Sequence, residues 1–242
     1  MKIYETFEDE YKYYIVIEAM LGDSLLTYIS KTPQTKFTEK FVAGIMKQVL
    51  QGLGNCHSYG IAHRDIKPDN IMFADKENTK AKLIDFGFAK MFDPGDRRVQ
   101  EVLGSPMYMA PEVCNRKPYD TKCDIWSCGI LCFILLSGEL PYNVDENAPL
   151  AMLLGLVKSV DFNLDNMKSD AWKRVSLEAK NFALSMLTKD PDKRPTAAQL
   201  LTSPWLDQAN DIQANVEDTK NCLDKLLKSH VINPHFILLG VY

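Results

Sequence analysis

Three short polar motifs follow one another along the chain, and their residue types suit the transfer of a phosphoryl group. HRDIKPDN occupies residues 63–70, DFG residues 85–87 and APE residues 110–112. Phosphoryl transfer needs a base beside the acceptor hydroxyl, hard oxygen ligands for magnesium and a segment that holds the substrate. One such motif alone could be a solvated surface loop. All three, in this order and spacing, predict a phosphoryl-transfer site.

Four side chains in these motifs have a predicted role that follows from their chemistry. Asp65 is the candidate base, because a carboxylate can orient the acceptor hydroxyl and accept its proton. Lys67 would neutralise charge on the transferring phosphate, which makes it more important for rate than for folding. Asn70 and Asp85 are candidate magnesium ligands, since Mg²⁺ takes one or two protein oxygens together with phosphate oxygens.

From Met1 to about Leu206 the sequence resembles the eukaryotic protein kinase family, on the strength of these three motifs. The resemblance implies an α+β, protein-kinase-like fold, with a mainly helical large lobe and a remnant of the small β lobe. It also implies ATP and Mg²⁺ as cofactors and a protein as substrate. Lys67, two residues after Asp65, is the serine/threonine pattern of the family. Ser105 resembles the hydroxyl that bonds the Asp65 and Lys67 pair, and these three are the expected catalytic residues.

The resemblance also implies a nucleotide site that begins near the N-terminus. Its residues would supply a gatekeeper, two backbone partners for adenine, a floor beneath the base, and the contacts to phosphate and magnesium. These residues are the gatekeeper Ile17, the hinge residues Glu18 and Met20, the floor residue Met72, and Lys67, Asn70 and Asp85.

Two further parts of a kinase nucleotide site have no counterpart in the sequence. It contains no GxGxxG loop and no VAIK-like lysine, which cover and contact the phosphates in this family. The glycines of Gly52-Leu53-Gly54 lie inside a helical pattern, so they indicate helix packing instead. Two explanations stay open. We expect a fragment of an active kinase, with little activity of its own, and keep a catalytically inactive scaffold or regulatory decoy as the alternative.

The expected organisation is a remnant of the small lobe and hinge at residues 1–20, a large lobe at 21–206 and a tail at 207–242. The stretches DFGFAK and GSPMYMAPEV resemble Unc-51-like kinases. The longer stretches CDIWSCGILCFILLSGELPY and DPDKRPT resemble the calcium-dependent and calmodulin-dependent group. That group has a hinge glutamate for substrate arginine, but this chain has Ser24 there and Asp69 in place of another glutamate. A preference for basic substrates is therefore not expected.

The composition is that of a folded, water-soluble domain. With 242 residues, 46% of them hydrophobic, and a net charge of −4, the chain can bury a core and has no basic excess that would attract nucleic acid or a membrane. Its longest apolar run, residues 130–136, is far shorter than the ~20 residues that span a bilayer. Six cysteines and four histidines show no metal-ligand spacing, so we expect buried reduced thiols, no zinc site and a cytoplasmic location.

Local patterns predict the elements that would position the motifs. Residues 13–18 form a short apolar, β-branched run and predict a strand. Residues 37–59 repeat apolar side chains at helical spacing before Gly60, and residues 124–137 are apolar on all sides, as in a buried helix. Short strands at Ile71–Phe73 and residues 81–84 would present Asn70 and Asp85. Thr196 and Gln199 form a capping-box pattern.

The activation segment, residues 85–112, suggests how the site is ordered. Its residues 88–104 contain no Ser, Thr or Tyr, and Glu101 stands where many kinases carry an activating phosphothreonine. A carboxylate near Arg64 could imitate part of the phosphate charge, although a solvated glutamate is the alternative. At the end of the segment, the resemblance pairs Glu112 with Arg194 in a buried ion pair.

The tail repeats apolar residues between lysines, a pattern typical of an amphipathic helix. The apolar positions are Val216, Leu223, Leu226, Leu227 and Val231. Such a helix can dock on its own lobe or bind a calmodulin-like partner, and the pattern fits both. No EF-hand loop is present in the sequence.

Overall fold

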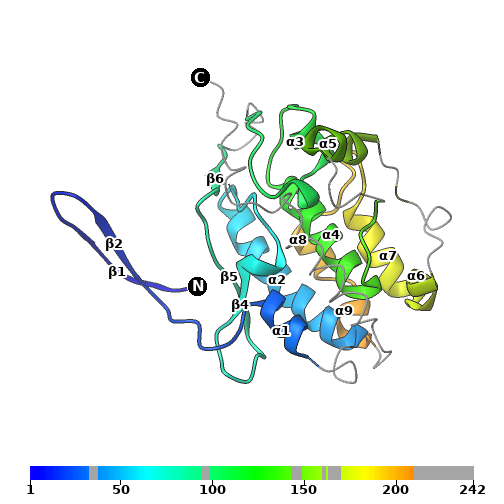
Figure 1. Ribbon diagram of the computed structural model, residues 1–242, viewed down its shortest axis with the longest axis horizontal. Helices are drawn as coiled ribbons and strands as arrows, with labels where there is room; N and C mark the ends of the chain where they lie inside the picture. The colour runs from blue at the N-terminus through cyan, green and yellow to red at the C-terminus, as the bar shows by residue number, and fades with distance from the viewer. Residues whose placement is uncertain (33–37, 94–98, 143–148, 160–161, 163–169, 210–242) are drawn as a thin grey trace.

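A computed structural model describes residues 1–32, 38–93, 99–142, 149–159, 162 and 170–209. Figure 1 shows a helical body from which an N-terminal β-hairpin projects. Within the described ranges the strands are β1 (Ile3–Glu8), β2 (Tyr13–Ile17), β3 (Ile61–Ala62), β4 (Ile71–Phe73), β5 (Ala81–Leu83) and β6 (Lys90–Met91). The helices are α1 (Leu25–Lys31), α2 (Glu39–Ser58), α3 (Pro111–Cys114), α4 (Lys122–Ser137), α5 (Leu150–Ser159), α6 (Asp170–Arg174), α7 (Leu177–Met186), α8 (Ala197–Leu200) and α9 (Trp205–Gln208), with 3-10 turns η2 (Pro68–Asn70) and η3 (Pro106–Tyr108).

The centre of the body is the buried helix α4. Every residue from Cys123 to Ser137 is buried, as the continuous apolar run predicts. Gly138 ends the helix in a left-handed conformation, with φ of 71°, which glycine adopts without strain. Helices α2 and α7 pack against α4, so the core lies between these three helices. Figure 1 shows α4 and α7 side by side.

Helix α2 is amphipathic and connects the core to the short strands. It begins after Thr38, whose side chain accepts a hydrogen bond from the backbone of Phe41, and it buries an apolar face that includes Met46, Leu50 and Leu53. The observed helix covers Glu39–Ser58, close to the predicted 37–59. Gly52 and Gly54 lie within it, which confirms that they belong to a helix.

Strands β4 and β5 form a two-stranded antiparallel sheet that packs on α2. Ile71 pairs with Leu83 and Phe73 with Ala81. Because the strands run in opposite directions, the residue before β4 and the residues after β5 share one end of the sheet. That end carries the predicted magnesium ligands Asn70 and Asp85.

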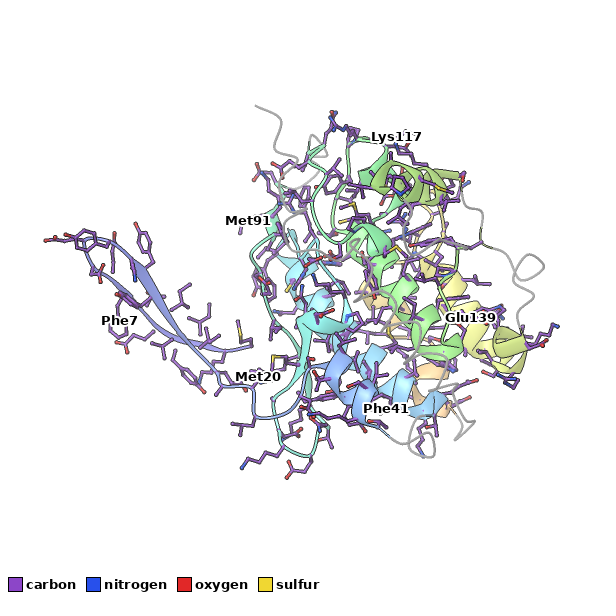
Figure 2. All side chains as sticks on the ribbon, in the orientation of Figure 1. Phe7, Met20, Phe41, Met91, Lys117 and Glu139 are labelled. Carbon is purple, nitrogen blue, oxygen red and sulfur yellow. The ribbon has the colours of Figure 1, made fainter. Side chains whose placement is uncertain are left out.

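The hairpin formed by β1 and β2 is exposed along its whole length. Its register runs from Ile3 opposite Ile17 to Glu8 opposite Tyr13, and every residue of both strands is exposed. Figure 2 shows Phe7 on the projecting part of the hairpin and Met20 near its junction with the body. The predicted strand at residues 13–18 is thus present as Tyr13–Ile17. Its assignment to a small-lobe remnant stays a prediction.

Other local predictions have definite outcomes. The capping box at Thr196 and Gln199 is present at the start of α8. The five described cysteines are free; four are buried as predicted, but Cys56 is only half-buried, because it lies near the end of α2. Cys222 and the predicted tail helix, apart from residues 207–209, lie outside the described residues. No helix among those described is both long enough and apolar enough to cross a bilayer.

Candidate active site

The structure gathers the three predicted catalytic residues around the carboxylate of Asp65. This side chain is buried, at 3% exposure, and both of its oxygens accept hydrogen bonds. Oδ1 accepts from the backbone N–H of Ser105 at 2.9 Å. Oδ2 accepts from Nδ2 of Asn70 at 2.8 Å and lies 2.9 Å from Nζ of Lys67. Such donors fix the orientation of the carboxylate.

Lys67 connects the catalytic loop to the activation segment. Its Nζ also donates a hydrogen bond to Oγ of Ser105 at 3.0 Å. The side chain is 19% exposed, so its charge lies at the edge of the site with limited access to water. The contact between Ser105 and the Asp65–Lys67 pair, implied by the family resemblance, is therefore present in the structure.

Asn70 and Asp85 meet at one end of the β4–β5 sheet, as predicted. The backbone N–H of Ile84 donates to the backbone oxygen of Asn70 at 3.0 Å. Nδ2 of Asn70 donates two hydrogen bonds to Asp65, one to the backbone oxygen of Asp65 and one to its Oδ2, both at 2.8 Å. The atom of this amide that can act as a metal ligand is therefore Oδ1.

Asp85 presents its carboxylate from a left-handed backbone position, with φ of 59°, an uncommon conformation that aspartate tolerates better than most residues. Its side chain is exposed, and Oδ1 accepts a hydrogen bond from the N–H of Gly87 at 3.1 Å. An amide oxygen and a carboxylate with access to solvent fit the preference of Mg²⁺ for a few hard oxygen ligands plus water and phosphate. Among the described residues, no three His, Cys, Asp or Glu side chains gather as a metal cluster.

The predicted adenine contacts lie where the hairpin joins the body. The N–H of Glu18 donates to the backbone oxygen of Lys2 at 2.8 Å, so the backbone group of Glu18 that remains for a base is its carbonyl. Ile17, the predicted gatekeeper, is 44% exposed, and Met20 is half-buried. The ion pair with Lys82 of β5 lowers the pKa of the Glu18 carboxyl and ties the hairpin to the body.

Met72, the predicted floor residue, is half-buried in the middle of β4 and forms an isolated β-bridge with Ser24. Ser24 itself caps α1, because its Oγ accepts a hydrogen bond from the N–H of Thr27 at 3.1 Å. Ser24 stands where the related kinases have a hinge glutamate for substrate arginine, and in this chain it has a structural role as a helix cap. At Asp69, burial raises the pKa of the carboxyl, with the nearby charge of Lys67 acting in the opposite direction.

A buried aspartate that the sequence analysis missed organises the catalytic loop. Asp124, in the first turn of α4, accepts hydrogen bonds from the backbone N–H groups of His63 and Arg64, both at 2.8 Å. The ring of His57 lies 2.9 Å from Oδ2 of the same carboxylate. An acid in an otherwise apolar helix is the signal that could have identified it, because a buried carboxylate needs donors.

His63 is held in one tautomer by its surroundings. Its Nε2 lies 2.9 Å from the backbone oxygen of Ile84, which can only accept, so Nε2 carries the proton. Nδ1 then accepts from the N–H of Asp65 at 3.3 Å. The ring of His63 also packs against Phe86, with centroids 4.8 Å apart. This histidine therefore links the end of β5 to the loop that carries Asp65.

Arg64 and Glu101 form an ion pair, as the position of Glu101 in the activation segment suggested. Nη1 of Arg64 donates to Oε2 of Glu101 at 2.6 Å, and its Nε donates to the backbone oxygen of Phe88 at 2.6 Å. Burial acts to lower the pKa of Arg64, but its bonds to Glu101 and Tyr119 outweigh burial and raise it. The same bond to Arg64 lowers the pKa of Glu101. Both side chains are thus charged at neutral pH.

Comparison with protein families agrees with this geometry. The family model of the protein kinase domain matches residues 1–206, and the chain belongs to the protein kinase family. The buried Asp65, its lysine and amide partners, and the β4–β5 end with Asp85 all lie within the matched residues.

Similar curated proteins include calcium-dependent protein kinases and CDPK-related kinases. Calcium-dependent protein kinase 14 of Arabidopsis thaliana is 36% identical over 230 residues, covering 95% of this chain and 41% of the relative. Calcium-dependent protein kinase 8 of the same plant is 41% identical over 207 residues, covering 85% and 37%. A CDPK-related protein kinase of Daucus carota is 37% identical over 214 residues, covering 88% and 34%. The chain thus spans well under half the length of these relatives.

Proposed function

We propose that this chain carries the catalytic centre of an ATP-dependent protein serine/threonine kinase, which transfers the γ-phosphate to protein hydroxyls. The observation that carries the proposal is the carboxylate of Asp65, which is buried and held by Lys67, Asn70 and the backbone of Ser105. These donors fix the direction of the carboxylate, as a base for an incoming hydroxyl requires.

Each side chain then has one task in the transfer. Asp65 orients the acceptor hydroxyl and takes its proton late in a loose transition state. Lys67 balances negative charge on the transferring group, and its bond to Ser105 at 3.0 Å keeps the amine pointing toward the acceptor side. Since the lysine is only partly exposed, its charge is screened less than that of a surface lysine.

The nucleotide and its metal would be held mainly by the end of the β4–β5 sheet and by the hinge. Oδ1 of Asn70 and the carboxylate of Asp85 would hold Mg²⁺, which supplies charge neutralisation on the phosphates when bound. The backbone of Glu18 and of Met20 would contact adenine, with Met72 beneath it. Ile17 would border the base from the hairpin side.

A protein segment is the acceptor that membership of the protein kinase family supports. The activation segment would hold it beside Asp65, since Ser105 of that segment is bonded to both Asp65 and Lys67. Because Ser24 caps a helix, this hinge position supplies no acid for a basic residue of the substrate.

A kinase-like scaffold or regulatory decoy is the second candidate, and one sequence feature favours it. The chain contains neither a GxGxxG loop nor a VAIK-like lysine to contact the phosphates. The intact network around Asp65 favours the catalytic function instead, because a scaffold has no use for a buried carboxylate held in one orientation by three donors.

Phosphate transfer by the 242-residue chain tests the proposal. The chain is incubated with γ-labelled ATP, Mg²⁺ and a mixed library of Ser- and Thr-containing peptides, and incorporated label is counted over hours so that slow turnover is detected. We expect incorporation that falls roughly a hundredfold or more in Asp65→Asn. Asp170→Asn, the same change at an exposed carboxylate of α6, serves as the matched control.

Three results are informative. Incorporation that depends on Asp65 and not on Asp170 supports a kinase. Binding of ATP·Mg²⁺ without incorporation supports the scaffold. Incorporation that is equal in wild type and Asp65→Asn overturns the assignment of the base.

We also propose that residues 1–20 act as a hinge and small-lobe portion, that residues 21–206 form the large lobe and that the tail, 207–242, binds its own lobe or a calmodulin-like partner in the cytoplasm. The support is the name of the relatives, which are calcium-dependent kinases, and the apolar spacing of the tail. Titration of the chain with calcium-loaded calmodulin, followed by fluorescence, tests whether the tail binds a calmodulin-like partner or its own lobe. Binding that persists after deletion of residues 210–242 removes the tail as the partner site.

A further inference from the structure

A tyrosine that the proposed chemistry does not use contacts the activation segment at three points and Arg64 of the catalytic loop at a fourth. Tyr119 lies between α3 and α4 and is 2% exposed. Its hydroxyl accepts from Nη1 of Arg64 at 3.0 Å and donates to the backbone oxygen of Glu101 at 2.9 Å. Its backbone N–H donates to the backbone oxygen of Val99 at 3.3 Å, and its ring meets Phe92 edge-on with centroids 6.0 Å apart.

The direction of these hydrogen bonds follows from their chemistry. A guanidinium can only donate, so the single proton of the Tyr119 hydroxyl must point to the carbonyl of Glu101. Burial raises the pKa of Tyr119 to about 12, with the bond from Arg64 acting in the opposite direction, so the hydroxyl keeps its proton at neutral pH. Loss of this one oxygen would leave both Arg64 and the Glu101 carbonyl without a partner that they have now.

Glu101 is thereby held at two places. Its carboxylate is bound by Arg64 at 2.6 Å and its backbone carbonyl by Tyr119. Half of the Glu101 side chain is exposed, so the ion pair alone is open to water and weak. The part-buried bond from Tyr119 to the main chain restricts the position from which the carboxylate can reach Arg64.

Arg64 transmits this arrangement to the catalytic residues. It directly precedes Asp65 in the chain, and its Nε donates to the backbone oxygen of Phe88, three residues after Asp85. The segments that carry the base and the metal ligand are therefore joined through one guanidinium.

We propose that Tyr119 is a positioning residue of the phosphoryl-transfer site: it fixes the main chain at Glu101 so that Arg64 can pair with Glu101 and hold the Asp65 and Asp85 segments together. This inference rests on the proposed kinase function for its consequence in catalysis. The alternative is a core tyrosine whose hydroxyl contributes only to overall stability.

Tyr119→Phe in the 242-residue chain separates these two roles. The substitution keeps the ring contact with Phe92 and the backbone bond to Val99 and removes only the hydroxyl. Tyr59→Phe, the same change at a tyrosine that is 69% exposed, is the matched control. The first readout is amide hydrogen exchange of residues 99–104 and of α4, measured by mass spectrometry without nucleotide. The second is the NMR signal of the Arg64 Nε–H group, assigned by its loss in Arg64→Lys.

We expect exchange in residues 99–104 to accelerate about fivefold to tenfold in Tyr119→Phe, while α4 and the Tyr59→Phe chain change little. The Arg64 Nε–H signal should move and exchange faster with water, because its bond to Phe88 loosens. Glu101→Gln, which weakens the side-chain bond to Arg64, should move the Arg64 Nε–H signal in the same direction. The double variant should add little, because the bond from Tyr119 acts on Arg64 through the position of Glu101.

Unchanged exchange at residues 99–104 together with an unmoved Arg64 signal overturns the inference. Equal acceleration across residues 99–104 and α4 also overturns it, because Tyr119 would then stabilise the whole fold and not this segment. Neither readout needs phosphate transfer. A wild-type chain that transfers no label therefore counts against the proposed function, whereas the exchange data alone decide the role of Tyr119.

Discussion

Arg64 and Glu101, 37 residues apart in the sequence, are joined by a hydrogen bond of 2.6 Å between a buried guanidinium and a half-exposed carboxylate. Lys90 is a more distant second partner, with Nζ 3.8 Å from Oε1 of Glu101. A phosphate at this position would bring more charge and more acceptor oxygens than one carboxylate. The glutamate supplies part of that interaction permanently, and this suggests ordering of the activation segment without modification.

The first prediction concerns the rate of phosphate transfer. Glu101→Ala removes the partner of Arg64 and should lower peptide phosphorylation about twofold to fivefold, the range that a half-exposed ion pair can supply. The labelled-ATP assay described above measures it. Glu77→Ala, which removes an exposed carboxylate from the β4–β5 loop, should leave the rate unchanged. An unchanged rate in Glu101→Ala would show a merely solvated glutamate.

The second prediction concerns the pH dependence of the same pair. The bond from Arg64 holds the pKa of Glu101 below its usual value of 4.5. A carboxyl whose pKa is lower in the folded state contributes stability that is complete above the ordinary pKa and is lost as the pH falls through the folded one. The pair should thus be insensitive to pH between 6 and 8 and should break only in acid, roughly below pH 4.5.

Carbon NMR of the Glu101 carboxyl can follow this titration directly. Its midpoint should lie below the ordinary glutamate value in the wild type and should move up in Arg64→Gln. A midpoint that stays in place in Arg64→Gln would mean that Arg64 does not set the pKa, and that Lys90 or the backbone does.

Residues near one another in the sequence were the ones that local patterns placed correctly. The strand Ile71–Phe73 and the capping box at Thr196 follow from neighbours within a few residues. The contact of Ser105 with the Asp65–Lys67 pair came from family resemblance, because Ser105 lies 38 residues after Lys67 and shares no local signal with it.

What local patterns missed depends on contacts between distant segments. Glu39 begins a helix, a place where an acid is normally solvated, yet it is 2% exposed and accepts hydrogen bonds from the backbone and side chain of Ser176, 137 residues away. Asp124 and Tyr119 were overlooked for the same reason. Only the packing of α4 beside the catalytic loop brings their polar atoms to Arg64 and its neighbours.

The third prediction concerns the buried ion pair that ends the activation segment. Arg194 is 1% exposed and binds Glu112 at two points, Nη1 to Oε1 at 2.7 Å and Nη2 to Oε2 at 3.0 Å. Glu112→Ala leaves the guanidinium buried without its counter-charge and should cost about 3–5 kcal/mol of unfolding free energy. Urea unfolding followed by circular dichroism measures it.

An exposed pair provides the control. Asp170 and Lys173 are 2.8 Å apart on α6, with 87% and 63% of their side chains exposed, so Asp170→Ala should change stability by less than about 0.5 kcal/mol. The double variant Glu112→Leu, Arg194→Met should be more stable than Glu112→Ala, because it removes both buried charges. Equal effects of Asp170→Ala and Glu112→Ala would contradict the stabilising role of the buried pair.

The fourth prediction compares two helical glycines that the sequence alone cannot tell apart. A Cβ at Gly44 of α2 would meet no heavy atom within 4 Å, whereas a Cβ at Gly129 of α4 would lie 2.8 Å from Cδ2 of Leu187 and 2.9 Å from Cβ of Met186. Leu187 could rotate away, but Cβ of Met186 moves only with the backbone at the end of α7. Close packing of α4 against α7 therefore requires glycine at position 129.

Alanine should act in opposite directions at the two sites. Gly44→Ala should raise the unfolding free energy by about 0.5–1 kcal/mol, because alanine loses less backbone entropy in a helix. Gly129→Ala should lower it by about 1–3 kcal/mol, because the overpacked methyl must displace α7. Urea titration of both variants gives the comparison. If Gly129→Ala were as stabilising as Gly44→Ala, α7 would have to be free to shift, and the contact between these two helices would not be a rigid part of the core.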